Sequence, residues 1–184
     1  PESVFAADMD GDGDMDILSA SNNDDTIAWY ENNGAADPSW TAANIATDKD
    51  GANSVFAADM DGDGDMDIVS ASINDDTIAW YENNGAADPT WTAANIETNT
   101  DQARSVYAAD MDGDGDMDIV SASSGDDTIA WYENNGAADP TWTKAVIATS
   151  ADSARGVYVA DMDGDGDMDI VSASQHDDTI AWYE

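Results

Sequence analysis

Apolar residues in the first 51 positions occur in short runs, which are separated by polar, turn-forming residues. Runs of this length, rich in aromatic and β-branched residues, are typical of β-strands. The connections contain Asn, Asp, Gly and Pro, which favour turns. The pattern predicts four strands, at residues 4–7, 17–21, 26–31 and 40–45. We therefore expect a four-stranded antiparallel meander.

The same pattern returns every 51 residues without a gap, and the first two copies differ at nine of 51 positions. The last copy stops after its third strand, so fifteen strands are expected. A single sheet of this size has too little interior to be stable alone, so the copies must pack face to face in one domain or domain segment, 1–184. The units are 1–51, 52–102, 103–153 and 154–184.

Side-chain size changes from strand to strand within each copy. The first two strands are rich in Ala and Ser, whereas the third and fourth carry Trp29, Tyr30 and Trp40. Small residues suit crowded inner strands and large ones suit diverging outer strands, as in a β-propeller. We therefore predict an all-β propeller of about four blades, the last lacking its outer strand. A β-sandwich or solenoid is the alternative, and it gives no reason for the size gradient.

The charge of the chain limits its partners. With 41 acidic and 4 basic residues, the net charge is -37, which excludes nucleic acid and anionic membrane surfaces as natural partners. No stretch approaches about 20 apolar residues, so membrane insertion is not expected. There is no cysteine, and thiolate metal sites are therefore excluded. Cations are the expected partners.

The nine residues 8–16, DMDGDGDMD, hold five carboxylates and occur in all four copies. Asp8, Asp10, Asp12 and Asp16 occupy positions 1, 3, 5 and 9 of a loop, with glycine at position 6 where a sharp turn is needed. Carboxylates 4 Å apart repel by about 4 kcal/mol per pair at an effective dielectric of 20. A divalent cation removes this repulsion. Together with the backbone carbonyl of Asp14, the carboxylates supply the oxygen-rich shell that Ca²⁺ prefers.

Two other interpretations of the acidic run are weaker. A disordered solvating segment does not fit four identical copies bracketed by predicted strands. An EF-hand loop needs Glu at position 12, where this chain has Ser19, and it needs flanking helices, where this chain has VFAA and ILSAS. The loop is therefore expected to join two strands.

With VFAA before it and VSAS after it, the motif DMDGDGDMDI resembles the FG-GAP or VCBS repeat, which is found in the calcium-binding blades of integrin α-chain propellers and in many secreted bacterial proteins. The resemblance covers all four units and implies a propeller with about four Ca²⁺ ions, one in each loop between the first and second strands. Familiar integrin-type propellers have seven blades, and this chain encodes about four. The implied ligands are Asp8, Asp10, Asp12, Asp14, Asp16, Asp59, Asp61, Asp63, Asp65, Asp67, Asp110, Asp112, Asp114, Asp116, Asp118, Asp161, Asp163, Asp165, Asp167 and Asp169, with the position-7 residue of each loop binding through its carbonyl.

The missing fourth strand of the last copy leaves an unpaired edge near Trp182. Two sources of the missing strand stay open: another chain, by self-association at this edge, or a continuation of the protein beyond residue 184. Three assemblies stay open: a closed four-bladed monomer, half of an eight-bladed dimer, and a segment of a longer array or fibre.

The acidic loops and the ENNGAADP loops should share one face of the molecule, because connections alternate ends in a meander. The copies differ most in the loops of the opposite face, at 22–23 and 46–53 and their counterparts. This variation reflects ligand contacts or tolerated drift, and drift is favoured because loops tolerate change. Trp29 and its counterparts are expected to pack between blades rather than stack on sugars. His176, the single histidine, is expected at the surface.

No catalytic constellation is present, and no enzyme activity is expected: the carboxylates are spaced as cation ligands, and Ser19 and Ser21 have no histidine near them in sequence. Two functions remain. The first is a calcium-binding structural or adhesive scaffold, secreted or at the cell surface, where calcium is plentiful. The second is a carbohydrate-binding lectin that uses the face opposite the calcium loops. A glycan or a protein is the expected ligand of such a molecule.

Overall fold

A computed structural model describes all residues, 1–184, as fifteen β-strands joined by turns and loops, with no helix. The first sheet contains β1 (Ser3–Ala7), β2 (Asp16–Ser21), β3 (Thr26–Asn32) and β4 (Trp40–Ala46). The second contains β5 (Ala52–Ala58), β6 (Asp67–Ser72), β7 (Thr77–Asn83) and β8 (Trp91–Glu97). The third contains β9 (Ala103–Ala109), β10 (Asp118–Ser123), β11 (Thr128–Asn134) and β12 (Trp142–Ala148). The fourth contains β13 (Ala154–Ala160), β14 (Asp169–Ser174) and β15 (Thr179–Tyr183).

Each sheet is an antiparallel meander whose strands lie side by side in chain order. The predicted strands and their order are confirmed. The observed strands extend beyond the predicted ranges by one residue at some ends, and β5, β9 and β13 begin three residues earlier than the repeat of 4–7 predicts. No helix is available that could cross a membrane. The fourth sheet has three strands, and β15 pairs with β14 alone, so its other edge is unpaired.

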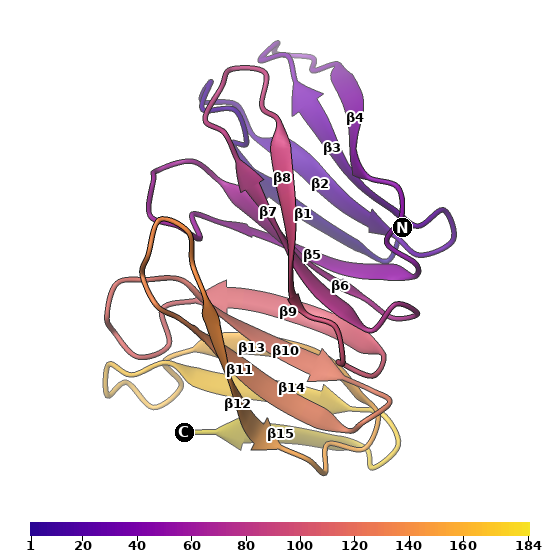
Figure 1. Ribbon diagram of the computed structural model, residues 1–184, viewed down its shortest axis with the longest axis vertical. Coiled ribbons are helices and arrows are strands. Elements are labelled where there is room, and N and C mark those ends of the chain that lie inside the picture. Colours follow the sequence, from indigo (N-terminus) through magenta and orange to yellow (C-terminus); the bar gives the residue numbers. More distant parts are fainter.

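The four sheets stack in chain order along the longest axis of the molecule (Figure 1). The first strands β1, β5, β9 and β13 contact one another in succession, and the second strand of each sheet contacts the first strand of the next. All elements are strands, so the predicted all-β class is confirmed. The first and fourth sheets lie at opposite ends of the stack, so the predicted closure into a propeller ring is not confirmed.

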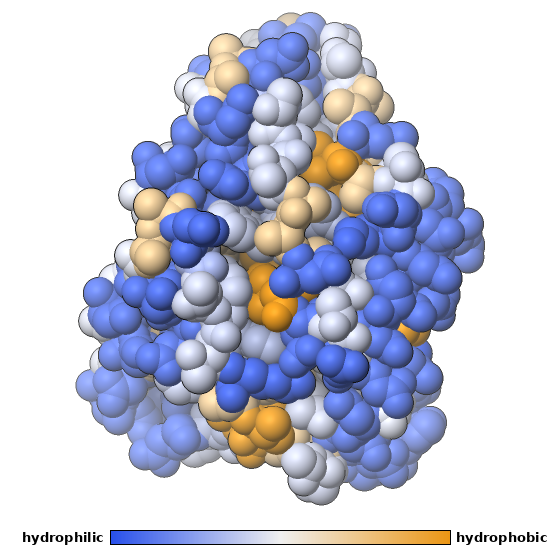
Figure 2. All heavy atoms as spheres, in the orientation of Figure 1, coloured by the Kyte–Doolittle hydropathy of each residue, from blue (hydrophilic) through white to orange (hydrophobic).

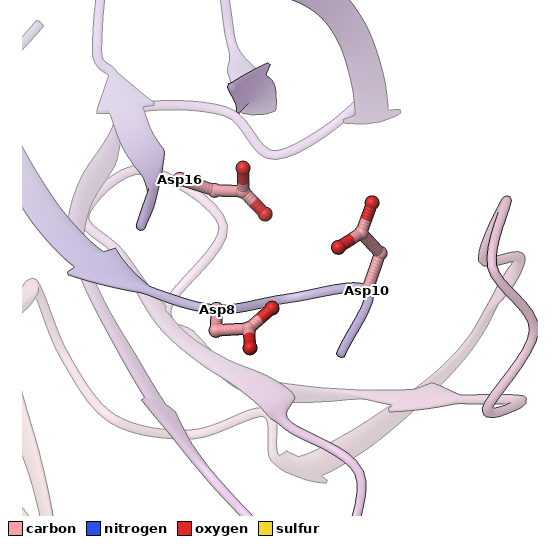
Figure 3. Close-up of side chains that lie close together, drawn as sticks. All are labelled: Asp8, Asp10 and Asp16. Carbon is pink, nitrogen blue, oxygen red and sulfur yellow. The ribbon is translucent and has the colours of Figure 1, made fainter. Parts of the chain in front are cut away.

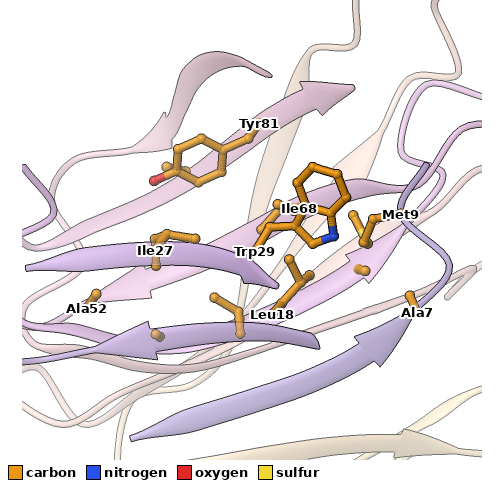
Figure 4. Packing of buried hydrophobic residues seen from close by; sticks show 12 residues of the cluster. Ala7, Met9, Leu18, Ile27, Trp29, Ala52, Ile68 and Tyr81 are labelled. Atoms are coloured by element: carbon orange, nitrogen blue, oxygen red, sulfur yellow. The ribbon is translucent and has the colours of Figure 1, made fainter. Parts of the chain in front are cut away.

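The core lies between successive sheets rather than inside any one of them. Between the first two sheets, Leu18, Ile27 and Trp29 pack against Ile68 and Tyr81 (Figure 4). Equivalent clusters fill the second and third interfaces. Every residue of β6 and of β10 is buried, as expected for strands covered on both faces. The outer strand β4 is largely exposed.

The turns opposite the acidic loops explain why an Asp-Asp pair recurs in every copy. Asp25 has a positive φ of 56°, a conformation that Asp and Asn tolerate better than most residues. Its carboxylate accepts a hydrogen bond from Gly51 N at 3.0 Å, which ties the turn to the connection that enters the next sheet. Asp76 and Asp127 have the same φ and make the equivalent bonds. The second aspartate of each of the first three pairs is therefore a turn and linker residue, and Asp178 shares the turn conformation, with a φ of 54°.

Candidate metal centre

Each acidic loop connects the first and second strands of its sheet and projects from one end of that sheet. Gly11 and Gly13 have φ values of 73° and 94°, a region that residues with a Cβ rarely adopt. Inside the loop, Gly13 N donates to Asp8 Oδ2 at 3.0 Å and Asp14 N donates to Asp12 Oδ1 at 2.8 Å. The aspartate side chains thus also serve as acceptors that shape the turn. Equivalent bonds recur in the other three loops.

The loops bring predicted ligands together. In the first loop, carboxylate oxygens of Asp8, Asp10 and Asp16 all lie within 4.8 Å of one another, and their side chains face a shared space (Figure 3). The second and third loops gather positions 1, 3 and 5, and the fourth gathers positions 1, 3 and 9. The corresponding groups are Asp59, Asp61 and Asp63; Asp110, Asp112 and Asp114; and Asp161, Asp163 and Asp169. Positions 1 and 3 therefore converge in all four loops.

The structure does not bring every predicted ligand into these groups. Asp12, Asp67 and Asp118, which were predicted to bind through their carboxylates, lie outside these groups. The carboxylates of Asp14, Asp65, Asp116 and Asp167, which were predicted to bind through their carbonyls, also lie outside them. A further group in the fourth loop joins Asp163 and Asp165 to Glu184, a residue that the loop motif does not contain. Only the folded arrangement, which carries β15 toward the loop, reveals Glu184 as a neighbour.

In the first three motifs, the last aspartate anchors the loop, whereas Asp169 of the fourth motif accepts a bond from Met162 N alone. Asp16 is 1% exposed, and it accepts hydrogen bonds from Met9 N at 3.1 Å and from Asn32 N at 2.8 Å. Asp67 and Asp118 make the same pair of bonds. One carboxylate therefore joins the start of the acidic loop to the end of the third strand.

The connection between the third and fourth strands packs directly on the acidic loop, so the two loops share one face as predicted. Asn32 Nδ2 donates to the Met15 carbonyl at 3.0 Å. Gly34 has a φ of 66°, and a Cβ at this position would collide with the Asp14 carboxylate. Gly85 and Gly136 have the same relation to Asp65 and Asp116. This glycine is required both by its φ and by the space that the acidic loop occupies.

An asparagine links each of the first two acidic loops to the following sheet. Asn83 Nδ2, at the end of β7, donates to the Met9 carbonyl at 2.9 Å, and Asn134 Nδ2 donates to the Met60 carbonyl at 2.7 Å. Met9 and Met60 are both 1% exposed and belong to the cores between sheets. The loops are therefore part of the interface between sheets.

Burial opposes the negative charge of several carboxyl groups. It raises the pKa of Asp67 to about 7, although hydrogen bonds from Asn83 N and Met60 N act in the opposite direction. Burial also raises the pKa values of Asp10, Asp61 and Asp118. Without a cation these loops hold charge unfavourably, since desolvation and neighbouring carboxylates both favour the neutral form.

The donor set fits a hard divalent cation. The clustered groups offer oxygen ligands alone, which Ca²⁺ and Mg²⁺ prefer over the softer metals. In the first loop, Asp8 Oδ1 is buried and has no hydrogen-bond partner. An unpaired buried carboxylate oxygen is costly, and a bound cation at the shared space would satisfy it. The residues present therefore suit the ion that the motif implies.

The remaining candidate residues have structural positions. Trp29 and Trp80 are each 4% exposed and lie in the cores between sheets, so the prediction that the tryptophans pack between sheets is confirmed for these two. It is wrong for Trp182, which is 51% exposed because no sheet covers the fourth one, and Trp131 is partly buried. His176 is exposed, and its Nδ1 lies 3.3 Å from Asp152 Oδ1. Because His176 lies at the opposite end of the fourth sheet from its acidic loop, it does not belong to the candidate metal centre.

Two solved structures are similar to this chain. An Agrocybe aegerita lectin, described as specifically recognising non-reducing terminal N-acetylglucosamine, has a TM-score of 0.60 and 23% sequence identity to this chain. The match covers 92% of this chain and 45% of the lectin. The V. cholerae biofilm matrix protein Bap1 has a TM-score of 0.49 and 20% identity, with coverage of 98% and 37%. This chain thus spans less than half the length of either protein, and the likeness to the lectin is one of fold.

No curated protein matches the sequence. A family model described as the FG-GAP-like repeat matches residues 8–70, 67–121 and 110–172. Together these segments cover most of the chain and include all four acidic loops. The chain therefore belongs to the FG-GAP-like repeat family.

Proposed function

We propose that this chain is a calcium-stabilised β-propeller scaffold that acts outside the cell, with one Ca²⁺ in each acidic loop. The observation that carries the proposal is the convergence of carboxylates in all four copies of the motif. Calcium suits this donor set better than Mg²⁺, because Mg²⁺ retains several waters and uses one or two carboxylates, whereas Ca²⁺ takes six to eight oxygens.

Calcium in such a loop would stabilise more than the loop itself. The loop is bonded to the third strand of its own sheet through Asp16 and Asn32, and to the next sheet through Asn83. Fixing the loop therefore favours the packing of neighbouring sheets. Extracellular modules bind calcium at about 10⁻⁴–10⁻³ M, which matches the supply of the ion outside cells and supports an extracellular site of action.

Closure of the sheets into a propeller belongs to the same proposal. Its support is the arrangement of the strands: the small-residue strands β1, β5, β9 and β13 lie in contact, while the outer strands carry the larger residues and are more exposed. Sheets that are close at their inner strands and apart at their outer strands form wedges, and a series of wedges curves toward a ring.

Thermal unfolding tests the calcium proposal. We expect a higher Tm in Ca²⁺ than in EDTA, because a ligand of the folded state at 100 times its Kd adds about 2.7 kcal/mol per site. Mg²⁺ at the same ionic strength should raise the Tm less. The variant Asp61→Asn should lose part of the calcium-dependent gain, and Asp88→Asn, which removes an exposed carboxylate outside the clusters, should keep it. Superimposable melts in Ca²⁺ and EDTA would contradict the proposal.

Carbohydrate binding is the second candidate, because the fold is shared with a lectin over 92% of this chain. The site would lie on the face opposite the acidic loops, where the copies differ in sequence. Trp29 and Trp80 are buried and are not available to stack on a sugar. Retention of the chain on resin bearing terminal N-acetylglucosamine, released by the free sugar, would support this candidate, and elution with the void volume would exclude that sugar.

A further inference from the structure

The two end sheets of the stack expose surfaces that are buried everywhere else in the molecule. In each internal interface, one sheet contributes a leading face and the next contributes a trailing face. We define the trailing face by Val4, Ile17, Tyr30, Trp40 and their counterparts at multiples of 51 residues. The leading face is defined by Phe5, Met9, Ile27, Trp29 and their counterparts. The first sheet has an uncovered trailing face, and the fourth sheet has an uncovered leading face.

Exposure of the trailing face depends on whether another sheet precedes it. Val4 is 69% exposed, whereas its counterparts Val55 and Val106 are 3% and 4% exposed. Trp40 is 43% exposed, whereas Trp91 packs against the first core. Pro1, Val4, Ile17, Ser19, Tyr30 and Trp40 together line a hollow on this surface. The hollow corresponds to the place that a preceding leading face occupies in the internal interfaces.

The leading face of the fourth sheet shows the same contrast. Ile180 is 73% exposed and Trp182 is 51% exposed, whereas Ile27 and Trp29 of the first sheet are 0% and 4% exposed. Met162 is 55% exposed, and its counterpart Met9 is 1% exposed. The broad side of the stack is mostly hydrophilic and carries only separate apolar patches (Figure 2). Exposed apolar surfaces such as this leading face mark interaction sites.

From these observations we infer that the two end faces bind each other between separate copies of this chain, head to tail. The partner is a second copy because each face is one half of an interface that the chain already forms three times within itself. A junction between copies would place Ile180 and Trp182 of one copy against Val4, Ile17 and Tyr30 of the next. This inference goes beyond the proposed calcium binding and does not require it. It assigns closure of the proposed propeller to junctions between copies rather than to a junction within one chain.

A row of aromatic rings supports this pairing. The ring centroids of Phe5 and Phe56 are 4.5 Å apart, those of Phe56 and Tyr107 are 4.5 Å apart, and those of Tyr107 and Tyr158 are 5.1 Å apart. Tyr158, the last ring, is 57% exposed. In a head-to-tail junction it would meet Phe5 of the next copy and continue the row at a spacing that favours aromatic pairs.

The junction would differ from the internal interfaces in two respects. Each internal interface contains a hydrogen bond from a valine N–H of one sheet to a serine Oγ of the sheet before it. The pairs are Val55 N to Ser3 Oγ, Val106 N to Ser54 Oγ and Val157 N to Ser105 Oγ. In the fourth sheet the counterpart of these serines is Gly156, which has no hydroxyl group to accept such a bond. The fourth sheet also has no counterpart of Ile45 and Ala46, which pack against the first core. We therefore expect the junction between copies to be weaker than the interfaces within one chain.

Sedimentation analysis of the whole chain in calcium tests the inference. One copy has a mass of 19.3 kDa, and we expect species at multiples of this mass as concentration rises. Because like charge opposes association, the samples should contain enough salt to shorten the screening length to about 3–8 Å. A head-to-tail junction forms a ring where the rotation closes and an open series where it does not, and both support the inference. A monomer at all concentrations and salt levels overturns it.

Three charge variants determine which surfaces are used. Val4→Lys disrupts the trailing face and Ile180→Lys disrupts the leading face, and both residues are exposed, so single copies should stay folded. Each variant alone should be monomeric. A mixture of the two retains one intact face on each chain and should give a species of two chains and no larger one. Val146→Lys, at an exposed residue outside both faces, is the matched control and should associate like the wild type. Association of either face variant by itself would overturn the head-to-tail arrangement.

Gly156→Ser tests the alignment of the two faces by restoring the missing hydroxyl group. A Cβ at Gly156 meets no atom within 4 Å, so the fold accommodates the substitution. One added hydrogen bond should lower the Kd of association by about fivefold. An unchanged Kd would contradict the proposed alignment.

Discussion

Single residues in the acidic loops have more than one task. Asp67 is a predicted calcium ligand, and it also holds Met60 N and Asn83 N with its two carboxylate oxygens. Spacing in the sequence predicts the first task but not the second, because the second depends on where the third strand ends in space. The same is true of Asn83, whose bond to Met9 spans 74 residues.

The pH dependence of stability should depend on whether calcium is bound. In metal-free protein, burial raises the pKa of Asp67 from 3.8 to about 7, so the folded state binds a proton more tightly than the unfolded state does. The contribution of Asp67 to stability is therefore greatest below pH 4 and is lost as the pH rises through 7. We expect denaturant melts of Asp67→Asn in EDTA to show a weaker loss of stability between pH 5 and 8 than the wild type shows.

The control for this experiment is Asp88→Asn, an exposed position at which the wild-type pH dependence should persist. Bound calcium should reverse the sign for the wild type, because protons then compete with the cation for the carboxylate. Equal pH dependence in wild type and Asp67→Asn would show that this carboxyl group does not carry the effect.

The bond between Asn83 and the Met9 carbonyl can be measured with a matched pair of variants. Asn83→Ala removes hydrogen bonds to the carbonyls of both Met9 and Met66. Asn32→Ala removes only the bond to the Met15 carbonyl, which is equivalent to the Met66 bond, because no sheet precedes the one that contains Asn32. A buried hydrogen bond contributes about 0.5–1.5 kcal/mol. We expect Asn83→Ala to lower the free energy of unfolding by about 1 kcal/mol more than Asn32→Ala does, as measured by urea denaturation.

At the scale of elements, the sequence predicted the strands well because alternating apolar runs and turn residues agree in every copy. Irregularities were not predictable. The register of β3 and β4 shifts between Ile27 and Ala28, and no local signal in TIAWYE or WTAANI marks this shift. The contact between Gly34 and Asp14 was also hidden, because it joins two loops that are separated by two strands.

The glycine in the loop between the third and fourth strands should tolerate no side chain. Gly85→Ala introduces a Cβ at a φ of 65° and pushes it into the Asp65 carboxylate. Gly62→Ala is the matched control, since Gly62 has a φ of 75° but open space around it. The control should lose about 1–2 kcal/mol of stability from backbone strain alone, and Gly85→Ala should lose more. Equal losses in thermal denaturation would show that the two loops do not constrain each other.

At the scale of the whole molecule, the net charge of -37 predicts that cations are the partners of this chain. The structure shows that carboxylates cluster most closely in the acidic loops. Four Ca²⁺ ions would supply eight positive charges against a net charge of -37, so much of the surface stays acidic. The repeat predicted that neighbouring sheets pack on one another, and it also explains why the two end sheets expose complementary faces. Ring closure could not be predicted from the sequence. It depends on the small rotation between successive sheets, and that rotation is determined by the packing of many residues together rather than by any single residue.

Native mass spectrometry of the chain in calcium tests the central claim most directly, because it counts the ions bound to each 19.3 kDa chain. Occupied acidic loops predict four Ca²⁺ per chain, and three per chain for Asp61→Asn when the weakened second site loses its ion during desalting. The Asp88→Asn control should retain four. A spectrum that shows metal-free chains at millimolar calcium would contradict the assignment of the DMDGDGDMD loops as calcium sites.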